Sequence, residues 1–243
     1  MLHKLKDDAI FIADAHYQVG VRESFYNFLL KVKKEEIQTS QLIMIGDMFD
    51  LLVGAIDYTI KENQKVIDII NTLSEKKEIL YFEGNHDFNL QRLFPSLIVI
   101  PISQQPLLCH YHDKKVALSH GDLFQGLGYR VYSALIRNLF ILKSLNFLDK
   151  HGNNFISKKI LLAHKNKDIC KKIENFANII KQKSKKYDIA SNGFDVICEG
   201  HYHMNEEYSL EGSQYRLFSS YACGNIYFTI DFKEDIVFTP HKG

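Results

Sequence analysis

Five short apolar segments, each followed at once by polar residues, constrain this sequence more than any other feature. They cover residues 9–13, 41–45, 78–82, 115–119 and 195–199. Each contains an unbroken run of apolar, β-prone residues, which is typical of a strand buried on both faces. Residues 22–34 and 58–73 separate the first three segments and repeat apolar residues at helical spacing. The alternation predicts an α/β fold in which helices cover sheets.

The end of the chain predicts a second sheet. Residues 215–218, 226–231 and 236–238 have strand-like composition without helical periodicity. The chain is 243 residues long, 46% of them hydrophobic, with only 13 Gly and 4 Pro. This composition excludes a disordered, collagen-like or low-complexity protein, and the length is sufficient to bury a substantial core.

A basic insertion, residues 125–190, separates the fourth and fifth predicted strands. It contains 14 lysine and arginine residues against 4 acidic ones, although the whole chain has a net charge of only +1. Its apolar residues recur at helical spacing. We therefore expect a core formed by residues 1–124 and 191–243 and a helical lid insertion over 125–190. A basic surface suits an anionic partner. Alternatively, the lysines only keep the exposed faces of helices soluble.

Cysteine usage and hydropathy bear on the cellular compartment. The four cysteines are widely spaced and form no C-x-x-C pair: Cys109, Cys170, Cys198 and Cys223. We therefore expect reduced thiols in a cytosolic protein. The apolar run at 9–13 is too short for the core of a secretion signal. Residues 129–148 are apolar but contain three basic side chains, so we expect no membrane-spanning helix.

The polar residues that follow the five segments are mostly metal-binding types. They are Asp14, His16, Asp47, Asp50, Asn85, His86, Asp87, His120, Asp122, His201 and His203. The carboxyl ends of neighbouring strands meet at one edge of a sheet, where ligands bind in open α/β folds. Asp14 and His16 are two positions apart, as are His201 and His203, so each pair can face the same side of an extended segment.

This residue set predicts two divalent cations. Asp47 could bridge both ions, and Asn85 and His120 would complete the ligands. Imidazole and carboxylate together favour Mn, Fe or Zn. Two such ions about 3.5–4 Å apart activate a water molecule and stabilise an in-line displacement at phosphorus. Any one of these residues has an ordinary explanation as a turn, helix cap or surface residue, but five strand ends in order do not.

The motifs D-x-H, G-D-x-x-D, G-N-H-D, H-G-D and G-H-x-H, in this order, resemble those of the calcineurin-like metallophosphoesterase superfamily. The resemblance implies a four-layer α/β/β/α sandwich with two metal sites that share Asp47. One site would contain Asp14, His16, Asp47 and His203, and the other Asp47, Asn85, His120 and His201.

The same resemblance implies roles for the remaining polar residues. His86 would act as a general acid or contact the phosphate, and Asp87 would orient it. Asp50 and Asp122 would support the metal ligands, because ligating imidazoles usually need a carboxylate or carbonyl partner.

The chain is also similar to the UDP-2,3-diacylglucosamine pyrophosphatase family of lipid A biosynthesis. The similarity rests on G-D-M-F-D at 46–50, N-H-D-F at 85–88 and H-G-D at 120–122, and on the inserted lid. It implies manganese-dependent hydrolysis of a UDP-linked diacylglucosamine to UMP and the diacyl sugar 1-phosphate. The enzyme would work at the cytoplasmic face of the inner membrane, where the apolar, basic insertion meets acyl chains and anionic headgroups.

Two features depart from that family's pattern. His86 stands where the family commonly has Arg, and residues 125–128, Gln-Gly-Leu-Gly, replace an acidic pair. Asn85 and four lysines of the insertion are candidate substrate contacts, although solvated helix charges explain the lysines equally well. These lysines are Lys158, Lys159, Lys165 and Lys167.

Two other functions stay as alternatives. A soluble metal-dependent phosphodiesterase, phosphatase or nuclease of the same superfamily would use the basic insertion to hold nucleic acid. Leu135, Leu139 and Leu142 make the insertion too apolar for that role, so nucleic acid is disfavoured. A non-catalytic scaffold ranks last because all seven ligand positions are intact. The sequence leaves the oligomeric state open.

Overall fold

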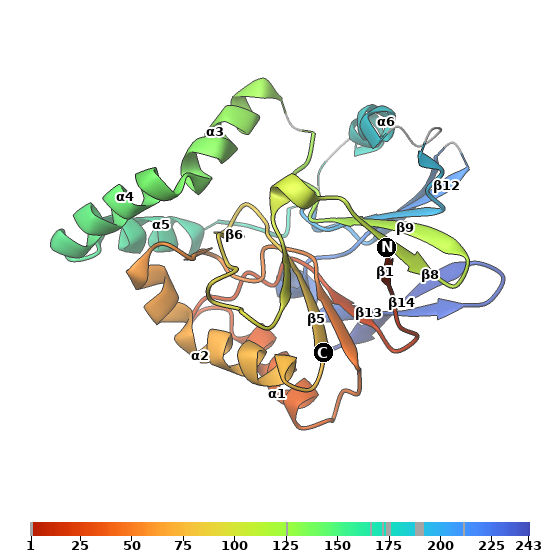
Figure 1. Ribbon diagram of the computed structural model, residues 1–243, viewed down its shortest axis with the longest axis horizontal. Helices are drawn as coiled ribbons and strands as arrows, with labels where there is room; N and C mark the ends of the chain where they lie inside the picture. The colour runs from red at the N-terminus through yellow and green to blue at the C-terminus, as the bar shows by residue number, and fades with distance from the viewer. Residues whose placement is uncertain are drawn as a thin grey trace.

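The computed structural model describes residues 2–124, 126–165, 167–171, 173, 176–187, 192–210 and 212–243. Two six-stranded sheets lie face to face, and helices cover both outer faces (Figure 1). The predicted α/β class and the four-layer α/β/β/α sandwich are therefore confirmed.

The first sheet has the strand order β14–β13–β2–β3–β5–β7. Its strands are β2 (Ile10–Ile12), β3 (Gln41–Met44), β5 (Glu78–Phe82), β7 (Ile98–Ile100), β13 (Ile226–Phe232) and β14 (Ile236–Lys242). The strands from β2 to β7 are parallel, whereas β13 is antiparallel to β2. The loops after β2, β3 and β5 therefore leave the sheet at one edge.

The second sheet has the strand order β1–β8–β9–β10–β12–β11. Its strands are β1 (His3–Lys4), β8 (Leu107–Tyr111), β9 (Lys114–Ser119), β10 (Val196–Glu199), β11 (Glu206–Leu210) and β12 (Ser213–Leu217). The three central strands β9, β10 and β12 are parallel. A small parallel ladder joins β4 (Leu52–Val53) to β6 (Asp87–Phe88).

Helices close the outer layers of the sandwich. They are α1 (Ser24–Lys33), α2 (Asp57–Ser74), α3 (Leu127–Arg137), α4 (Leu139–His151), α5 (Phe155–Lys165), α6 (Phe176–Tyr187) and α8 (Tyr221–Gly224), with a 3-10 turn η1 (Ile102–Gln104). α1 and α2 cover the first sheet, where Phe28 and Ile70 share an apolar cluster with Tyr81. Phe11 and Cys198 belong to the apolar layer between the two sheets.

Helices α3, α4 and α5 form an arm beside the sandwich, which we call the lid (Figure 1). Leu142 of α4 packs with Val53 and Phe88, which lie on the small ladder. Asn146 of the same helix accepts a hydrogen bond of 2.9 Å from the backbone N–H of Asp57. The lid is thus held over the loops that follow β3 and β5.

Helix α6 lies apart from the lid although it falls within the same basic insertion. Its Phe176 and Ile180 share an apolar cluster with Ile197 and Tyr215 of the second sheet. The assignment of residues 125–190 to one insertion stays a prediction. Within that range, the structure separates the lid from a helix that forms the fourth layer of the sandwich.

The expectation of four reduced thiols is wrong for one pair of cysteines. Cys170 and Cys223 form a disulfide, although 53 residues separate them in sequence. The fold brings the segment before α6 beside the short helix α8, and no sequence spacing reports such a contact. Cys109 and Cys198 are free and buried. Among the described residues, no helix has both the length and the apolar character needed to span a bilayer.

The lid has an internal anchor that can be tested. Asp149 of α4 accepts hydrogen bonds from the backbone N–H groups of Ile156 (2.8 Å) and Ser157 (3.2 Å) at the start of α5. We expect Asp149→Ala to destabilise α5 by about 1–2 kcal/mol, because these N–H groups lose their acceptor. Hydrogen exchange should quicken at the α5 amides but not at those of α2. Unchanged exchange in α5, relative to the exposed-site control Asp113→Ala, would contradict the anchor.

Candidate metal centre

Two groups of metal-binding side chains lie at the carboxyl ends of strands from both sheets. The first contains Asp14, His16 and His203, and the second contains Asp47, His120 and His201. Within each group, one potential ligand atom of every residue lies within 4.8 Å of the others. A third group, His16 with Asp50 and His86, meets the same distance criterion and shares His16 with the first. The first two groups bring together six of the seven residues predicted as ligands, in the two predicted sets. That each group binds an ion stays a prediction.

In the first group, three ligand atoms converge on one point. His16 Nε2 lies 3.3 Å from His203 Nε2, which lies 3.5 Å from Asp14 Oδ1. Atoms that share one ion at roughly 2.0–2.2 Å are themselves about 3.0–3.4 Å apart, so these separations are close to those of a metal site. The Nδ1–H of His203 donates to the carbonyl of Ile169. Its Nε2 therefore presents a lone pair to the centre.

The second group has the same organisation around His120. Its Nδ1–H donates to the carbonyl of Ile45 (3.0 Å), which leaves the Nε2 lone pair free. This Nε2 lies 3.4 Å from Asp47 Oδ2 and 3.4 Å from Asn85 Oδ1. Asn85, the seventh predicted ligand, thus lies with the second group. That Asp47 lies between the two sites and bridges both ions stays a prediction.

The backbone has a rare conformation at five predicted ligands, and two glycines leave room for ligand side chains. Five ligands have a left-handed backbone with φ between 43° and 64°, a rare conformation that concentrates at functional sites: Asp14, His16, Asp47, His201 and His203. A Cβ on Gly84 would lie 2.1 Å from Asp47 Oδ1, and one on Gly46 would lie 2.4 Å from His120 Nδ1. The glycines before Asp47 and Asn85 therefore let the ligands approach one another.

The charge balance of the site fits divalent cations. Burial lowers the pKa of His16 to about 3 and, with His120, that of His201 to about 3, so both imidazoles are neutral near pH 7, the form that binds metals. Burial also opposes charge on His120, but the Asp47 carboxylate raises its pKa well above the ordinary value. Positive charge beside Asp47 is thus favourable. Buried Asp14 Oδ1 accepts no hydrogen bond from any residue in the described ranges, and a cation would satisfy it.

Asp50 lies beside a predicted ligand, whereas support of the ligands by Asp122 stays a prediction. Asp50 pairs with the guanidinium of Arg22, and its Oδ1 lies 3.2 Å from His16 Nδ1. This contact leaves His16 Nε2 for the first group. Asp122 Oδ2 accepts a hydrogen bond of 2.8 Å from the Tyr129 hydroxyl.

The structure corrects the role expected for Asp87. The Nδ1–H of His86 donates to the carbonyl of Asp50 (2.8 Å), so this carbonyl and not Asp87 orients the ring. The Asp87 carboxylate points into the protein and accepts from the backbone N–H groups of Asp47, Met48 and Gly84. Burial, together with the nearby Asp47, raises the pKa of Asp87 to about 7. Asp87 is buried completely and shapes the loop that carries Asp47.

His164 is a residue of the site that the sequence analysis missed. It projects from α5 of the lid, and its Nδ1–H donates to the same Asp50 carbonyl (2.9 Å) as His86. The two imidazole centroids are 4.7 Å apart. Burial, reinforced by His86, lowers the pKa of His164 to about 4. The available signal was the helical spacing of Ile156, Ile160 and His164, which places the histidine on an apolar face.

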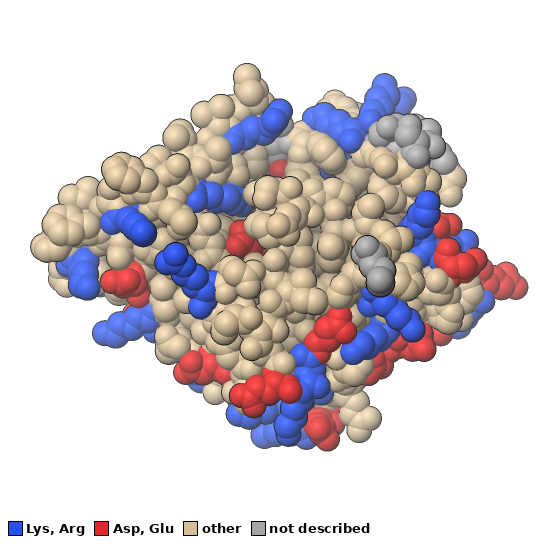
Figure 2. All heavy atoms as spheres, in the orientation of Figure 1, with Lys and Arg blue, Asp and Glu red and all other residues tan. Residues whose placement is uncertain are grey.

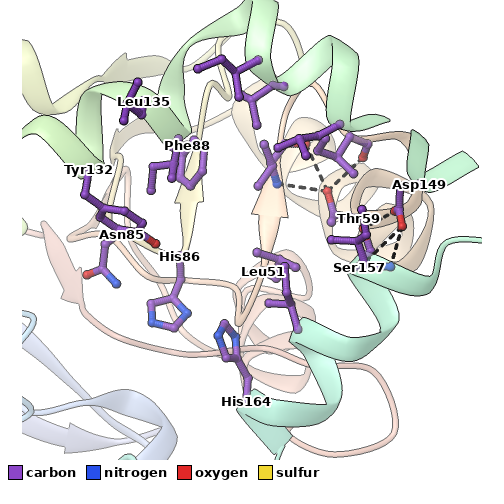
Figure 3. Close-up of a pocket in the computed structure, with 18 residues that line it drawn as sticks. Leu51, Thr59, Asn85, His86, Phe88, Tyr132, Leu135, Asp149, Ser157 and His164 are labelled. Carbon is purple, nitrogen blue, oxygen red and sulfur yellow. Dashed lines mark hydrogen bonds between the residues drawn. The ribbon is translucent and has the colours of Figure 1, made fainter. Parts of the chain in front are cut away.

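An apolar cavity of about 330 Å³ begins at these two histidines (Figure 3). Asn85 and His86 lie at the side nearest the metal ligands. Leucine and isoleucine side chains of the lid line the cavity together with residues after β3: Leu51, Val53, Ile56, Leu135, Ile136, Ile141, Leu142, Leu145, Ile156 and Ile160. A polar centre and an apolar chamber are therefore adjacent, a combination typical of sites for amphipathic ligands.

The four candidate lysines differ in position. Lys158 and Lys165 line a separate hollow beside Tyr17, and Lys158 also donates to the carbonyl of Asn153 (2.9 Å). Lys159 is exposed. The charge of Lys167 helps to lower the pKa of both His86 and His164, after the larger effect of burial. Substrate contact by each of the four stays a prediction.

Comparison with known proteins agrees with this geometry. Residues 9–205 match the family described as Calcineurin-like phosphoesterase. A UDP-2,3-diacylglucosamine hydrolase of Coxiella burnetii is 26% identical over 113 residues, and the match spans 46% of this chain and 46% of the relative, about half the length of each. The protein of the same name from Haemophilus influenzae is 27% identical over 210 residues, which covers 83% of this chain and 85% of that one. An archaeal phosphodiesterase structure aligns with 12% identity and a TM-score of 0.47 over 96% of this chain and 99% of the other.

The family match covers most of the chain and all the predicted ligands, so this protein belongs to the calcineurin-like phosphoesterase family. Membership of this family implies divalent metal ions at the centre described above.

The fit of the centre to cations can be tested by metal-dependent stability. We expect a divalent cation added to chelator-treated protein to raise the Tm, because it binds only the folded centre. Asp14→Asn removes one anionic ligand and should weaken the apparent metal affinity at least about tenfold. Thermal denaturation against metal concentration measures this shift, with the exposed Asp113→Asn as control. An identical metal dependence in wild type and Asp14→Asn would contradict the assignment.

Proposed function

We propose that this enzyme hydrolyses the pyrophosphate of a UDP-linked 2,3-diacylglucosamine and releases UMP and 2,3-diacylglucosamine 1-phosphate. One observation carries the proposal: the apolar cavity of the lid begins beside Asn85 and His86, at the metal centre. Such a substrate joins acyl chains to a pyrophosphate through one sugar, so it needs these two environments side by side. The Haemophilus relative is named a UDP-2,3-diacylglucosamine hydrolase, which supports the same substrate for this chain.

The residues of the site have distinct tasks in this reaction. When bound, the ions supply Lewis acidity toward phosphate oxygens and lower the pKa of the attacking water. Asn85 and the two anchored histidines His86 and His164 lie where the phosphate enters the cavity. Because Nδ1 of each ring is held by Asp50, Nε2 is the atom that meets the substrate. To serve as the predicted general acid, His86 must take up a second proton at Nε2, because its Nδ1–H is donated to the Asp50 carbonyl.

We further propose that the bound ions are manganese. The ligand set combines imidazole, carboxylate and amide oxygen, and no free cysteine is in either group of ligands. A thiolate-free set of N and O ligands argues against a purely structural zinc site and suits Mn.

The outer surface of the lid supports a peripheral membrane location at the cytoplasmic face of the inner membrane. Large apolar side chains are exposed on its three helices: Leu127, Val131, Leu139, Phe140, Phe147, Leu148, Phe155 and Leu162. Basic residues lie among them, and Figure 2 shows the arm as mostly uncharged surface with scattered basic side chains. An apolar face with cations at its border binds anionic lipid surfaces.

The reaction is tested by product release. We expect purified protein with manganese to release UMP from UDP-2,3-diacylglucosamine in detergent micelles, detected by chromatography. Turnover of bis-p-nitrophenyl phosphate or oligonucleotides without turnover of the lipid would reject this substrate in favour of a soluble phosphodiesterase.

A matched pair of leucine variants distinguishes a role of the cavity in acyl binding from a general effect of changing the lid. Leu135 lines the cavity, whereas Leu148, which is exposed to a similar degree, lies outside it. We expect Leu135→Gln to lower the ratio of kcat/KM for the lipid to that for bis-p-nitrophenyl phosphate about tenfold, since an acyl contact of about 1.4 kcal/mol is lost. Leu148→Gln should leave this ratio at the wild-type value. An equal ratio in both variants would remove the acyl-binding role.

A further inference from the structure

A second cavity lies on the other side of α3 from the apolar one. Its volume is about 810 Å³, and α3, the loop after β9 and α6 contribute to its walls. Figure 2 shows basic side chains on both helices, on either side of the gap between them. No residue lines both this cavity and the apolar one. Helix α3 therefore separates two chambers.

The inner end of this cavity adjoins the metal centre. Arg137 donates a hydrogen bond of 2.8 Å to the carbonyl of Gly84, the residue before Asn85. Asp122, two residues after His120, forms part of the wall. Its Oδ1 is buried without a hydrogen-bond partner among the residues that the structure describes. A ligand in this cavity would thus reach the metal-bound phosphate and could satisfy a buried acceptor.

The walls combine three kinds of group. Arg130, Arg137 and Lys186 supply positive charge, and Phe124 and Tyr129 supply aromatic rings. Asp122 and Glu83 add carboxylates. The side chain of Lys186 also donates to the carbonyl of Phe124, which joins α6 to the loop after β9. Cations, rings and a buried acceptor together match a nucleotide, because a pyrimidine stacks on aromatic groups and carries both donors and acceptors at its edge.

We propose that this cavity binds the nucleoside half of the substrate while the apolar cavity binds the acyl half. The proposal rests on the function proposed above, in which a pyrophosphate joins the two halves. Once the pyrophosphate lies at the metal centre, the halves must leave it in different directions. The two chambers on either side of α3 provide those directions, and among their described lining residues lysine and arginine belong to this chamber and not to the apolar one.

The test compares binding of UMP with binding of inorganic phosphate to the manganese-loaded protein by calorimetry. We expect the wild type to bind UMP more tightly than phosphate, since the nucleoside adds contacts. Arg130→Gln/Lys186→Gln should weaken the UMP Kd about tenfold or more, as expected for lost contacts to charged groups, and leave the phosphate Kd unchanged. The control Lys33→Gln/Lys185→Gln removes two exposed lysines that line no part of this cavity. Its UMP Kd should equal that of the wild type.

Two results would overturn the proposal. The first is a wild-type protein that binds UMP no more tightly than phosphate. The second is a UMP Kd that the Arg130→Gln/Lys186→Gln variant leaves unchanged. Failure of the proposed function is a separate result, because it is measured as absent UMP release by the wild type. If that reaction fails but the double variant still loses UMP binding, the cavity is a nucleotide site that serves another phosphoester.

Discussion

The buried convergence of carboxylates and imidazoles at the sheet edge is the interaction on which the rest of the structure depends. His16 and His203 bring two ring nitrogens to 3.3 Å, and Asp14 and Asp47 add buried negative charge. Without compensating cations such an arrangement opposes folding, since buried charges and lone pairs lose their hydration. Parallel strands and close-fitting glycines such as Gly84 hold the ligands together despite left-handed backbone conformations. Fold and metal binding are thus two aspects of one constraint.

The lid determines what can reach this centre. Through His164 it places a side chain beside His86, and both rings are held by one carbonyl of the core. Its helix α3 then separates an apolar chamber from one with cations and aromatic rings. Under the proposed function, a phosphoester-cleaving centre would become selective for a substrate with two unlike halves because the lid separates them by polarity.

The sequence predicts the parts of the fold that are buried and continuous. The core strands that precede the predicted ligands could be predicted because their apolar runs are unbroken. Helices α1 and α2 could be predicted because they are amphipathic. The edge strands β7 and β11 were missed because β7 is only three residues long and β11 mixes polar with apolar residues. The ligands were predictable because each follows a strand. His164, the orientation of Asp87 and the Cys170–Cys223 disulfide depend on how distant segments meet, which local pattern does not encode.

Anomalous diffraction from crystals grown with manganese tests the central claim most directly. The account predicts two manganese peaks about 3.5–4 Å apart. One should lie among Asp14, His16 and His203 and the other among Asp47, His120 and His201, with Asn85 beside the second. A single peak elsewhere, or none at these side chains in crystals of active protein, would contradict it.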